Sequence, residues 1–166
     1  MDRQLLIIYH TRTEGTRQMA DAVLAGALAE DDGHTTARLL HANNAQPADL
    51  LAAHAYVFAT PENLAAMTGE MKAFFDRCYY PVLDRIQGRP YTVMVCAGSD
   101  GSNAVRQIER IATGWRLKAV APALIVCTHA QTPEQILAPK TLGAKDLTRC
   151  SELGEGLAAG LSAGIF

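Results

Sequence analysis

The feature of this chain that most constrains its fold is a regular alternation of short apolar runs with amphipathic segments. Five runs rich in apolar and β-branched residues predict strands at residues 5–9, 35–40, 56–60, 91–97 and 123–127. The first, fourth and fifth runs are apolar almost throughout, which indicates burial on both faces. This alternation predicts an α/β fold with a parallel sheet, right-handed crossovers and helices on both sides.

Apolar periodicity and end signals place the segments between the strands. Apolar residues at i and i+4 predict helices at about 16–33, 67–81, 105–115 and 145–163, and a short one at 47–53. Thr68 is expected to cap the third helix and Pro81 to end it. The stretch 128–144 contains two prolines and is expected to be an irregular edge loop.

The predicted topology brings two of the loops together. Five such strands fit the doubly wound order 2-1-3-4-5, in which a ligand lies at the carboxyl ends beside the switch point between strands one and three. Those two strands end at Tyr9 and Thr60. We therefore expect the loops that follow them to lie side by side.

The loop at residues 10–17 is rich in hydroxyl groups. Thr11, Thr13 and Thr16 offer O–H donors, and free backbone N–H groups and the following helix dipole face the same point. This pattern predicts a phosphate cradle, with Arg12 either touching the phosphate or solvated. The chain has neither G-x-x-x-x-G-K-[ST] nor G-x-G-x-x-G, so we expect a mononucleotide. The alternative is that the threonines only form a turn and an N-cap.

Three loops together resemble a known family. Tyr9-x-Thr11-x-Thr13-x-x-Thr16 resembles the flavodoxin signature, whose threonine-rich loop binds the phosphate of FMN. Pro61-Glu62-Asn63 resembles a flavin-contacting loop of the NAD(P)H-dependent FMN and quinone reductases, and Ala97-Gly98-Ser99-Asp100-Gly101 completes the set. The resemblance covers nearly the whole chain and implies a flavodoxin-like three-layer sandwich with a five-stranded parallel sheet.

The resemblance also implies which residues bind FMN. They are Thr11, Arg12, Thr13, Gly15, Thr16, Thr60, Pro61, Glu62, Asn63, Ala97, Gly98, Ser99 and Asp100. For the second and third loops, the alternatives are an ordinary strand exit and a plain turn. Glu14 stands where flavodoxins usually have glycine, and a carboxylate beside the phosphate is expected to weaken binding.

The function that the resemblance implies is an FMN-dependent NAD(P)H oxidoreductase that reduces a quinone or another small acceptor. The flavin supplies the hydride chemistry, so no side chain need act as an acid or base. The alternatives are a flavodoxin-type electron carrier and an FMN-binding regulator without turnover. Residues 60–67 and 97–103 contain no aromatic side chain, which favours a ring face open to substrate, and the net charge of -2 is weak for steering toward a basic redox partner.

Composition excludes several other classes of protein. At 166 residues, with 49% hydrophobic and 19% charged residues, the chain is expected to form a single domain, residues 1–166. The near-neutral charge gives no support for binding nucleic acid or a membrane surface. The four cysteines form no C-x-x-C pair, which indicates reduced core thiols rather than metal or dithiol chemistry. No membrane span or signal peptide is apparent, so a cytoplasmic location is expected.

The third predicted helix suggests self-association. Its stripe at Met67, Met71, Phe74 and Phe75 is expected to be core. Apolar residues at 79, 80, 82 and 83 extend beyond that single stripe, and a domain of this size has little room to cover them. A homodimer through this helix is therefore expected.

Overall fold

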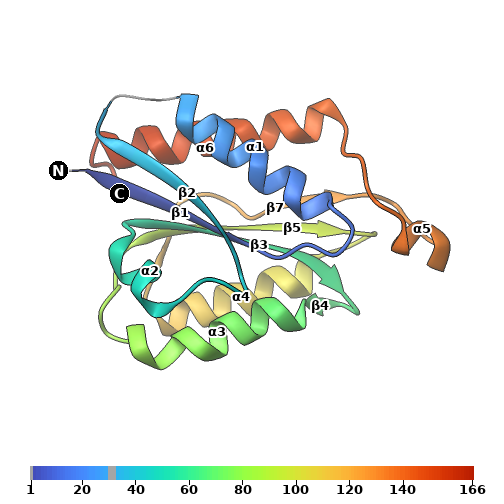
Figure 1. Ribbon diagram of the computed structural model, residues 1–166, viewed down its shortest axis with the longest axis horizontal. Helices are drawn as coiled ribbons and strands as arrows, with labels where there is room; N and C mark the ends of the chain where they lie inside the picture. The colour runs from blue at the N-terminus through green and yellow to red at the C-terminus, as the bar shows by residue number, and fades with distance from the viewer. Residues whose placement is uncertain (1, 30–32) are drawn as a thin grey trace.

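The computed structural model describes residues 2–29 and 33–166, which form three layers (Figure 1). The strands are β1 (Arg3–Tyr9), β2 (Thr35–His41), β3 (Ala55–Asn63), β4 (Ala66–Met67), β5 (Pro90–Ala97), β6 (Lys118–Ala119) and β7 (Leu124–Cys127). The helices are α1 (Gly15–Ala29), α2 (Pro47–Ala52), α3 (Gly69–Val82), α4 (Ser102–Gly114), α5 (Pro133–Leu137) and α6 (Ala144–Ser162). Helices α1 and α6 cover one face of the sheet, α2, α3 and α4 cover the other, and α5 projects beyond the end of β5.

The sheet confirms the predicted strand order. Its path is β2-β1-β3-β5, and both β6 and β7 pair in parallel with the outer edge of β5. Two short strands, β6 and β7, thus stand where one fifth strand was predicted. Pro122 between them has no N–H group to continue the hydrogen-bond ladder. Strand β4 adds an antiparallel pairing to the end of β3, which the sequence analysis did not predict.

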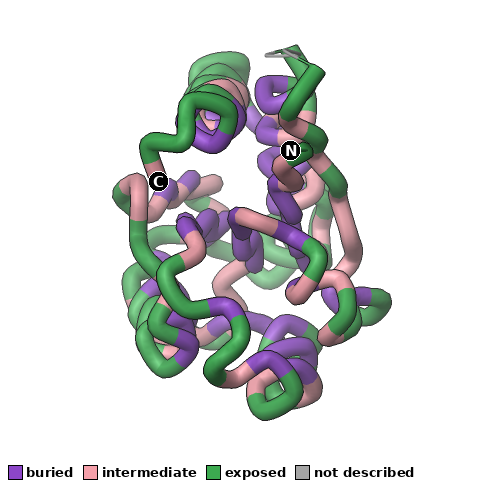
Figure 2. The backbone as a smooth tube through the Cα atoms, turned by 90° about the vertical axis from the view of Figure 1, so that its left-hand side faces the viewer, coloured by how far each residue is buried: buried purple, intermediate pink, exposed green. Residues whose placement is uncertain are grey.

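The two faces of the sheet bury different side chains. Phe58, Phe75 and Trp115 belong to an aromatic cluster under α3 and α4, whereas the cluster under α1 and α6 is largely aliphatic. Figure 2 shows the buried residues concentrated along the strands and on the inward sides of the helices. Helices α1 and α6 touch through Gly26 and Gly154, where any Cβ would collide with a backbone carbonyl of the facing helix.

Several predicted boundaries need correction. Thr68 caps α3 as expected, accepting a hydrogen bond from the Met71 N–H at 3.4 Å. Pro81 lies inside α3, which ends one residue later, because a proline in the last turn removes a single helical hydrogen bond. The stretch expected to be irregular contains α5, which has Pro133 at its first position and a capping box at Thr132.

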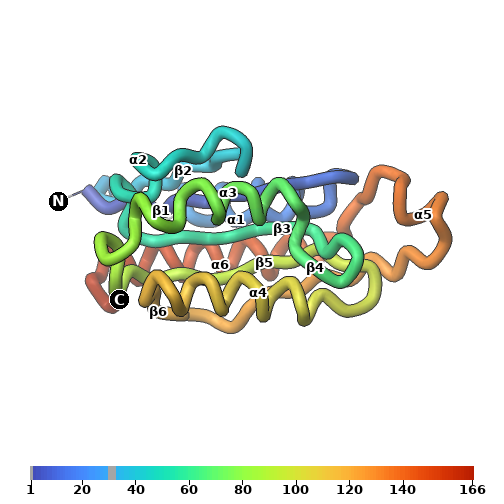
Figure 3. Tube along the Cα trace, turned by 90° about the horizontal axis from the view of Figure 1, so that it is seen from below, coloured from blue at the N-terminus to red at the C-terminus, as the bar shows by residue number. Residues whose placement is uncertain are grey.

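The apolar surface of α3 is mostly internal. Met71, Phe74 and Phe75 are buried, Val82 is buried, and Tyr80 is 78% exposed. Figure 3, from below, shows α3 and α4 crossing the same face of the sheet, with the β3–β4 hairpin at the end nearest α5. Among residues 2–29 and 33–166, the structure has no helix that is long and apolar enough to span a membrane.

Candidate functional site

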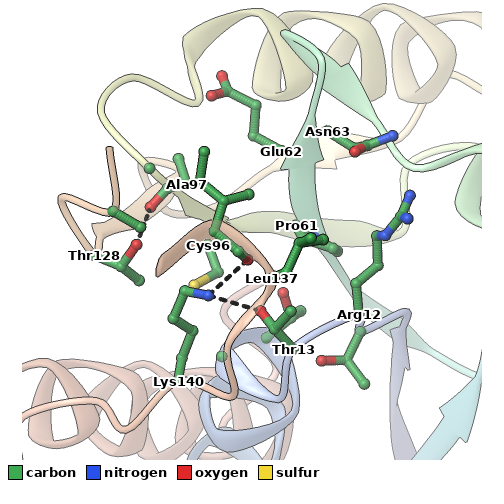
Figure 4. A pocket seen from close by; sticks show the side chains of 16 residues that line it. Arg12, Thr13, Pro61, Glu62, Asn63, Cys96, Ala97, Thr128, Leu137 and Lys140 are labelled. Atoms are coloured by element: carbon green, nitrogen blue, oxygen red, sulfur yellow. Dashed lines mark hydrogen bonds between the residues drawn. The ribbon is translucent and has the colours of Figure 1, made fainter. Parts of the chain in front are cut away.

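A pocket lies at the carboxyl edge of the sheet, where the segments after β1, β3, β5 and β7 converge (Figure 4). Ten of the residues that the sequence analysis assigned to FMN line it together: Thr11, Arg12, Thr13, Gly15, Thr16, Pro61, Glu62, Asn63, Ala97 and Gly98. Thr60, Ser99 and Asp100 do not line this pocket. The topology therefore brings together all three of the loops singled out from the sequence.

The β1–α1 loop presents unused hydrogen-bond donors to the pocket. The Thr16 hydroxyl is buried and has no partner among the described residues. Helix α1 begins at Gly15, so the N–H groups of its first turn have no intrahelical acceptor. Thr11 Oγ1 instead accepts the Glu14 N–H at 3.1 Å, which holds the loop in its turn. A buried donor without a partner beside a helix N-terminus fits an anionic phosphate group.

Glu14 has a backbone conformation that explains why flavodoxins usually have glycine at this position. The reason is steric and does not depend on the charge of the side chain. The φ of Glu14 is 71°, in the left-handed region that glycine adopts without steric cost. Its side chain is exposed and does not line the pocket. The expectation that this carboxylate sits beside the phosphate therefore finds no support in the geometry.

The second wall of the pocket is a strand end rather than the predicted loop. Residues 61–63 continue β3, and Pro61 is in register with Cys96 of β5. The proline is tolerated because β1 pairs with β3 only as far as Ala59, which leaves an open edge beyond it. The chain then reverses through Leu64 and Ala65, both with positive φ, and returns as β4.

Side-chain hydrogen bonds attach this hairpin to α4 and the loop before it. Glu62 Oε2 accepts the Gly101 N–H at 2.6 Å, and Asn103 Nδ2 donates to the Ala65 carbonyl at 2.7 Å. On β4, the Met67 N–H donates to Gln107 Oε1 at 2.9 Å. Glu62 thus both lines the pocket and holds the β5–α4 loop against it.

Of the three predicted residues that do not line the pocket, Thr60 joins two elements of the fold, and Ser99 and Asp100 are exposed. Thr60 is buried, and its hydroxyl accepts the Thr68 N–H at 3.2 Å, which joins β3 to the start of α3. Asp100 is exposed, and hydrogen bonds from Ser102 lower the pKa of its carboxyl group. Ser99 lies beside it in the same loop and is not buried.

The structure adds lining residues that the sequence analysis missed. They are Cys96, Thr128, Ala130, Ile136, Leu137 and Lys140. Lys140 Nζ donates to Thr13 Oγ1 at 3.3 Å, so the lysine reaches the hydroxyl-rich loop from the far end of the chain (Figure 4). No local pattern marks this contact, because the two residues are 127 positions apart.

The chemistry of the pocket walls is that of a binding site. No aromatic side chain occurs among its lining residues, and no metal-ligand cluster occurs in the described part of the chain. Burial raises the pKa of the Cys96 thiol to about 11, so this group is neutral at physiological pH. The walls therefore offer hydrogen-bond donors, apolar surface, the basic side chains of Arg12 and Lys140 and the carboxylate of Glu62.

Comparisons with known proteins agree with this geometry. The sequence model described as NADPH-dependent FMN reductase matches residues 34–131, more than half of the chain. A protein named flavodoxin from Aquifex aeolicus (strain VF5) is 34% identical over 86 residues. That alignment covers 52% of this chain and 45% of the relative, so the chain matches less than half of that protein's length.

Solved structures show the same fold at low sequence identity. A flavodoxin from the domain Archaea superposes with a TM-score of 0.75 at 16% identity, covering 96% of this chain and 99% of the other. A WrbA-like flavodoxin from Agrobacterium tumefaciens has a TM-score of 0.73 at 20% identity, covering 95% and 96%. Rubredoxin oxygen:oxidoreductase from Desulfovibrio gigas has a TM-score of 0.75 at 14% identity, covering 98% of this chain and 37% of that one.

The matching fold establishes the flavodoxin-like architecture, and the family match supplies the cofactor class. With the unpartnered Thr16 hydroxyl at a helix N-terminus, the site also fits a phosphorylated flavin on structural grounds. The chain therefore belongs to the NADPH-dependent FMN reductase family and is an FMN-binding protein.

Proposed function

We propose that this protein is an FMN-dependent NAD(P)H oxidoreductase that reduces a quinone or another small acceptor. We also propose that residues 1–166 form a single FMN-binding domain. Bound FMN would supply the hydride chemistry. The β1–α1 loop, with Thr11, Thr13 and Thr16, would hold the phosphate. The ends of β3 and β5 would hold the ring.

The observation that favours an oxidoreductase is the absence of aromatic side chains from the described lining of the pocket. A carrier normally covers its ring with such side chains, whereas an enzyme needs one face free for a nicotinamide or a quinone. The wall at Pro61 and Asn63 presents small and polar groups instead. The net charge of -2 is also weak for long-range steering toward a protein partner.

Anaerobic turnover tests this proposal. The FMN-loaded protein should consume NADPH or NADH rapidly, in equal amount to an added soluble benzoquinone. Asn63→Trp should cover the open wall and lower turnover while FMN stays bound. The matched control is Leu28→Trp, which should retain turnover. Leu28 is 52% exposed and lies in the last turn of α1, whereas the pocket is at the first turn.

The carrier alternative makes the opposite prediction. A protein that accepts electrons from dithionite but consumes neither nicotinamide would contradict the oxidoreductase assignment. Equal turnover by the parent protein and Asn63→Trp would contradict the role given to the open wall.

A further inference from the structure

We propose that Lys140 is the cationic ligand of the flavin phosphate and that it couples phosphate binding to the position of residues 133–142, here called the strap. This inference rests on the phosphate site of the proposed function. Lys140, which lies outside the β1–α1 loop, would favour phosphorylated flavins over flavins without a phosphate. The strap would then have a ligand-dependent position.

The strap is attached to the phosphate loop by backbone and amide groups. The Lys140 N–H donates to the Thr13 carbonyl at 2.7 Å. Gln18 of α1 donates to the Lys140 carbonyl at 2.7 Å and accepts the Leu142 N–H at 3.0 Å. The backbone of Lys140 is thus fixed against the loop without help from its side chain.

The side chain of Lys140 has only neutral partners. Its Nζ donates to Thr13 Oγ1 at 3.3 Å, to the Ile136 carbonyl at 2.9 Å and to the Ala138 carbonyl at 2.6 Å. None of the ion pairs in the described residues includes this lysine. The half-buried ammonium group thus has hydrogen-bond partners but no carboxylate beside it, and it reaches the loop in which the buried Thr16 hydroxyl has no partner among the described residues.

A dianionic monoester at this loop would give the Thr16 hydroxyl a partner and would replace Thr13 Oγ1, the longest of the three contacts of Lys140 Nζ. It would accept from Thr16 and the helix N-terminus and give Lys140 a charge-assisted hydrogen bond, which is stronger than a bond to a neutral oxygen. The same contact would hold α5, because Lys140 also binds the carbonyls of Ile136 and Ala138. Ile136 and Leu137 line the pocket and are 50% and 72% exposed, so binding the phosphate would keep apolar surface over the flavin.

Flavin binding to the apoprotein, measured by quenching of flavin fluorescence, tests the assignment. Lys140→Met should weaken FMN binding about 10- to 100-fold and leave riboflavin affinity within about twofold, because only FMN has the charged group. Lys140→Arg should retain most of the FMN affinity. Lys145→Met, at an exposed position on α6, is the matched control and should bind as the parent does.

A second measurement needs no variant. Millimolar inorganic phosphate should slow thermolysin cleavage at Ile136 and Leu137 severalfold in the parent apoprotein, whereas sodium chloride of equal ionic strength should not. Lys140→Met should lose this protection. If that variant does not fold, the phosphate and chloride comparison on the parent, together with Lys140→Arg, decides the question.

The outcomes separate this inference from the function on which it rests. Equal losses of FMN and riboflavin affinity in Lys140→Met would show that the lysine only positions the strap, and unchanged FMN affinity would show that it does not contact the phosphate. Cleavage unaffected by phosphate would overturn the coupling to the strap. A parent protein that bound FMN and riboflavin equally would refute the phosphate site itself.

Discussion

The two walls of the pocket differ in how they are built. The wall that we propose to hold the phosphate, here called the phosphate wall, is the loop at residues 10–14 and the start of α1, and it is attached to the strap through Thr13 and Gln18. The wall that we propose to hold one side of the ring, here called the ring wall, is the β3–β4 hairpin, whose tip, Leu64, is 93% exposed. The first wall is attached to a segment from the far end of the chain, whereas the second is attached to α4 and the loop before it, with its tip exposed.

In the proposed function the two walls do different work. A phosphate is the same in every reaction that FMN supports, so its site benefits from a rigid arrangement of donors. In an oxidoreductase the ring must meet a second substrate, and the exposed tip of the hairpin is where we propose that it does so. The family match begins at residue 34, after the phosphate loop, and includes the entire ring wall.

The largest effect is expected from removing the unpartnered hydroxyl in the phosphate wall. Thr16→Val should weaken FMN binding by about 1.5–3 kcal/mol, the range for a hydrogen bond to a charged group. The apoprotein should be as stable as the parent or more so, because a buried hydroxyl without a partner is removed. Titration calorimetry and urea unfolding measure the two effects.

Thr113→Val is the matched control for that substitution, since this hydroxyl is exposed and bonds to the Glu109 carbonyl. It should leave FMN affinity unchanged. A Thr16→Val apoprotein that lost stability without losing FMN affinity would show that the hydroxyl serves the fold, and the contrast between the walls would fail.

A smaller effect, a gain in the free energy of unfolding, is expected at the tip of the ring wall. Leu64 and Ala65 have φ values of 49° and 64°, in a two-residue hairpin turn that favours Asn-Gly. The double change Leu64→Asn, Ala65→Gly should stabilise the protein by about 1–2 kcal/mol, because it relieves left-handed strain. Urea unfolding would detect it, and the ratio of FMN to riboflavin affinity should not change. A changed ratio would mean that the two walls are coupled.

Glu14 tests whether strain or charge matters more in the phosphate wall. Glu14→Gly should stabilise the apoprotein by about 1 kcal/mol through its φ of 71°. Glu14→Gln keeps the strained backbone and removes the charge, so it should change neither stability nor FMN affinity appreciably. Tighter FMN binding by Glu14→Gln at low salt would restore the electrostatic expectation from the sequence.

The smallest effect concerns His10, which does not line the pocket and lies between the end of β1 and the start of α3. It lies after β1, and its Nε2 is 3.8 Å from Glu70 Oε2 at the start of α3. Burial lowers its pKa from 6.5, more than the Glu70 carboxylate raises it. The unfolded chain therefore binds the proton more readily, and the free energy of unfolding should fall as the pH drops through 6.5.

Urea unfolding at several pH values between 5 and 8 measures this dependence. His10→Asn should reduce the slope below pH 6.5, because the buried imidazole with the lowered pKa is removed. An unaltered slope in His10→Asn would assign the pH dependence to other groups.

The sequence by itself determined the strand order and the edge of the sheet where the site lies. Apolar periodicity reports which residues are buried within each element, and strand-helix alternation leaves few topologies. Ten of the residues that the family resemblance implied meet in one pocket, because the strands before them all end at this edge of the sheet. The helix start beside the hydroxyl-rich loop is also predicted to within one residue, because a helix start and its loop are set by neighbouring residues.

The tertiary structure alone decided how each wall is supported. Lys140 reaches Thr13 across 127 positions, and Glu62 reaches Gly101 across 39. The extension of β3 past Pro61 depends on β5 beside it and on the place where β1 ends. Such contacts arise only when distant segments pack together. The periodicity of one segment indicates which of its own side chains are buried, but not which side chain of a distant segment will lie against them.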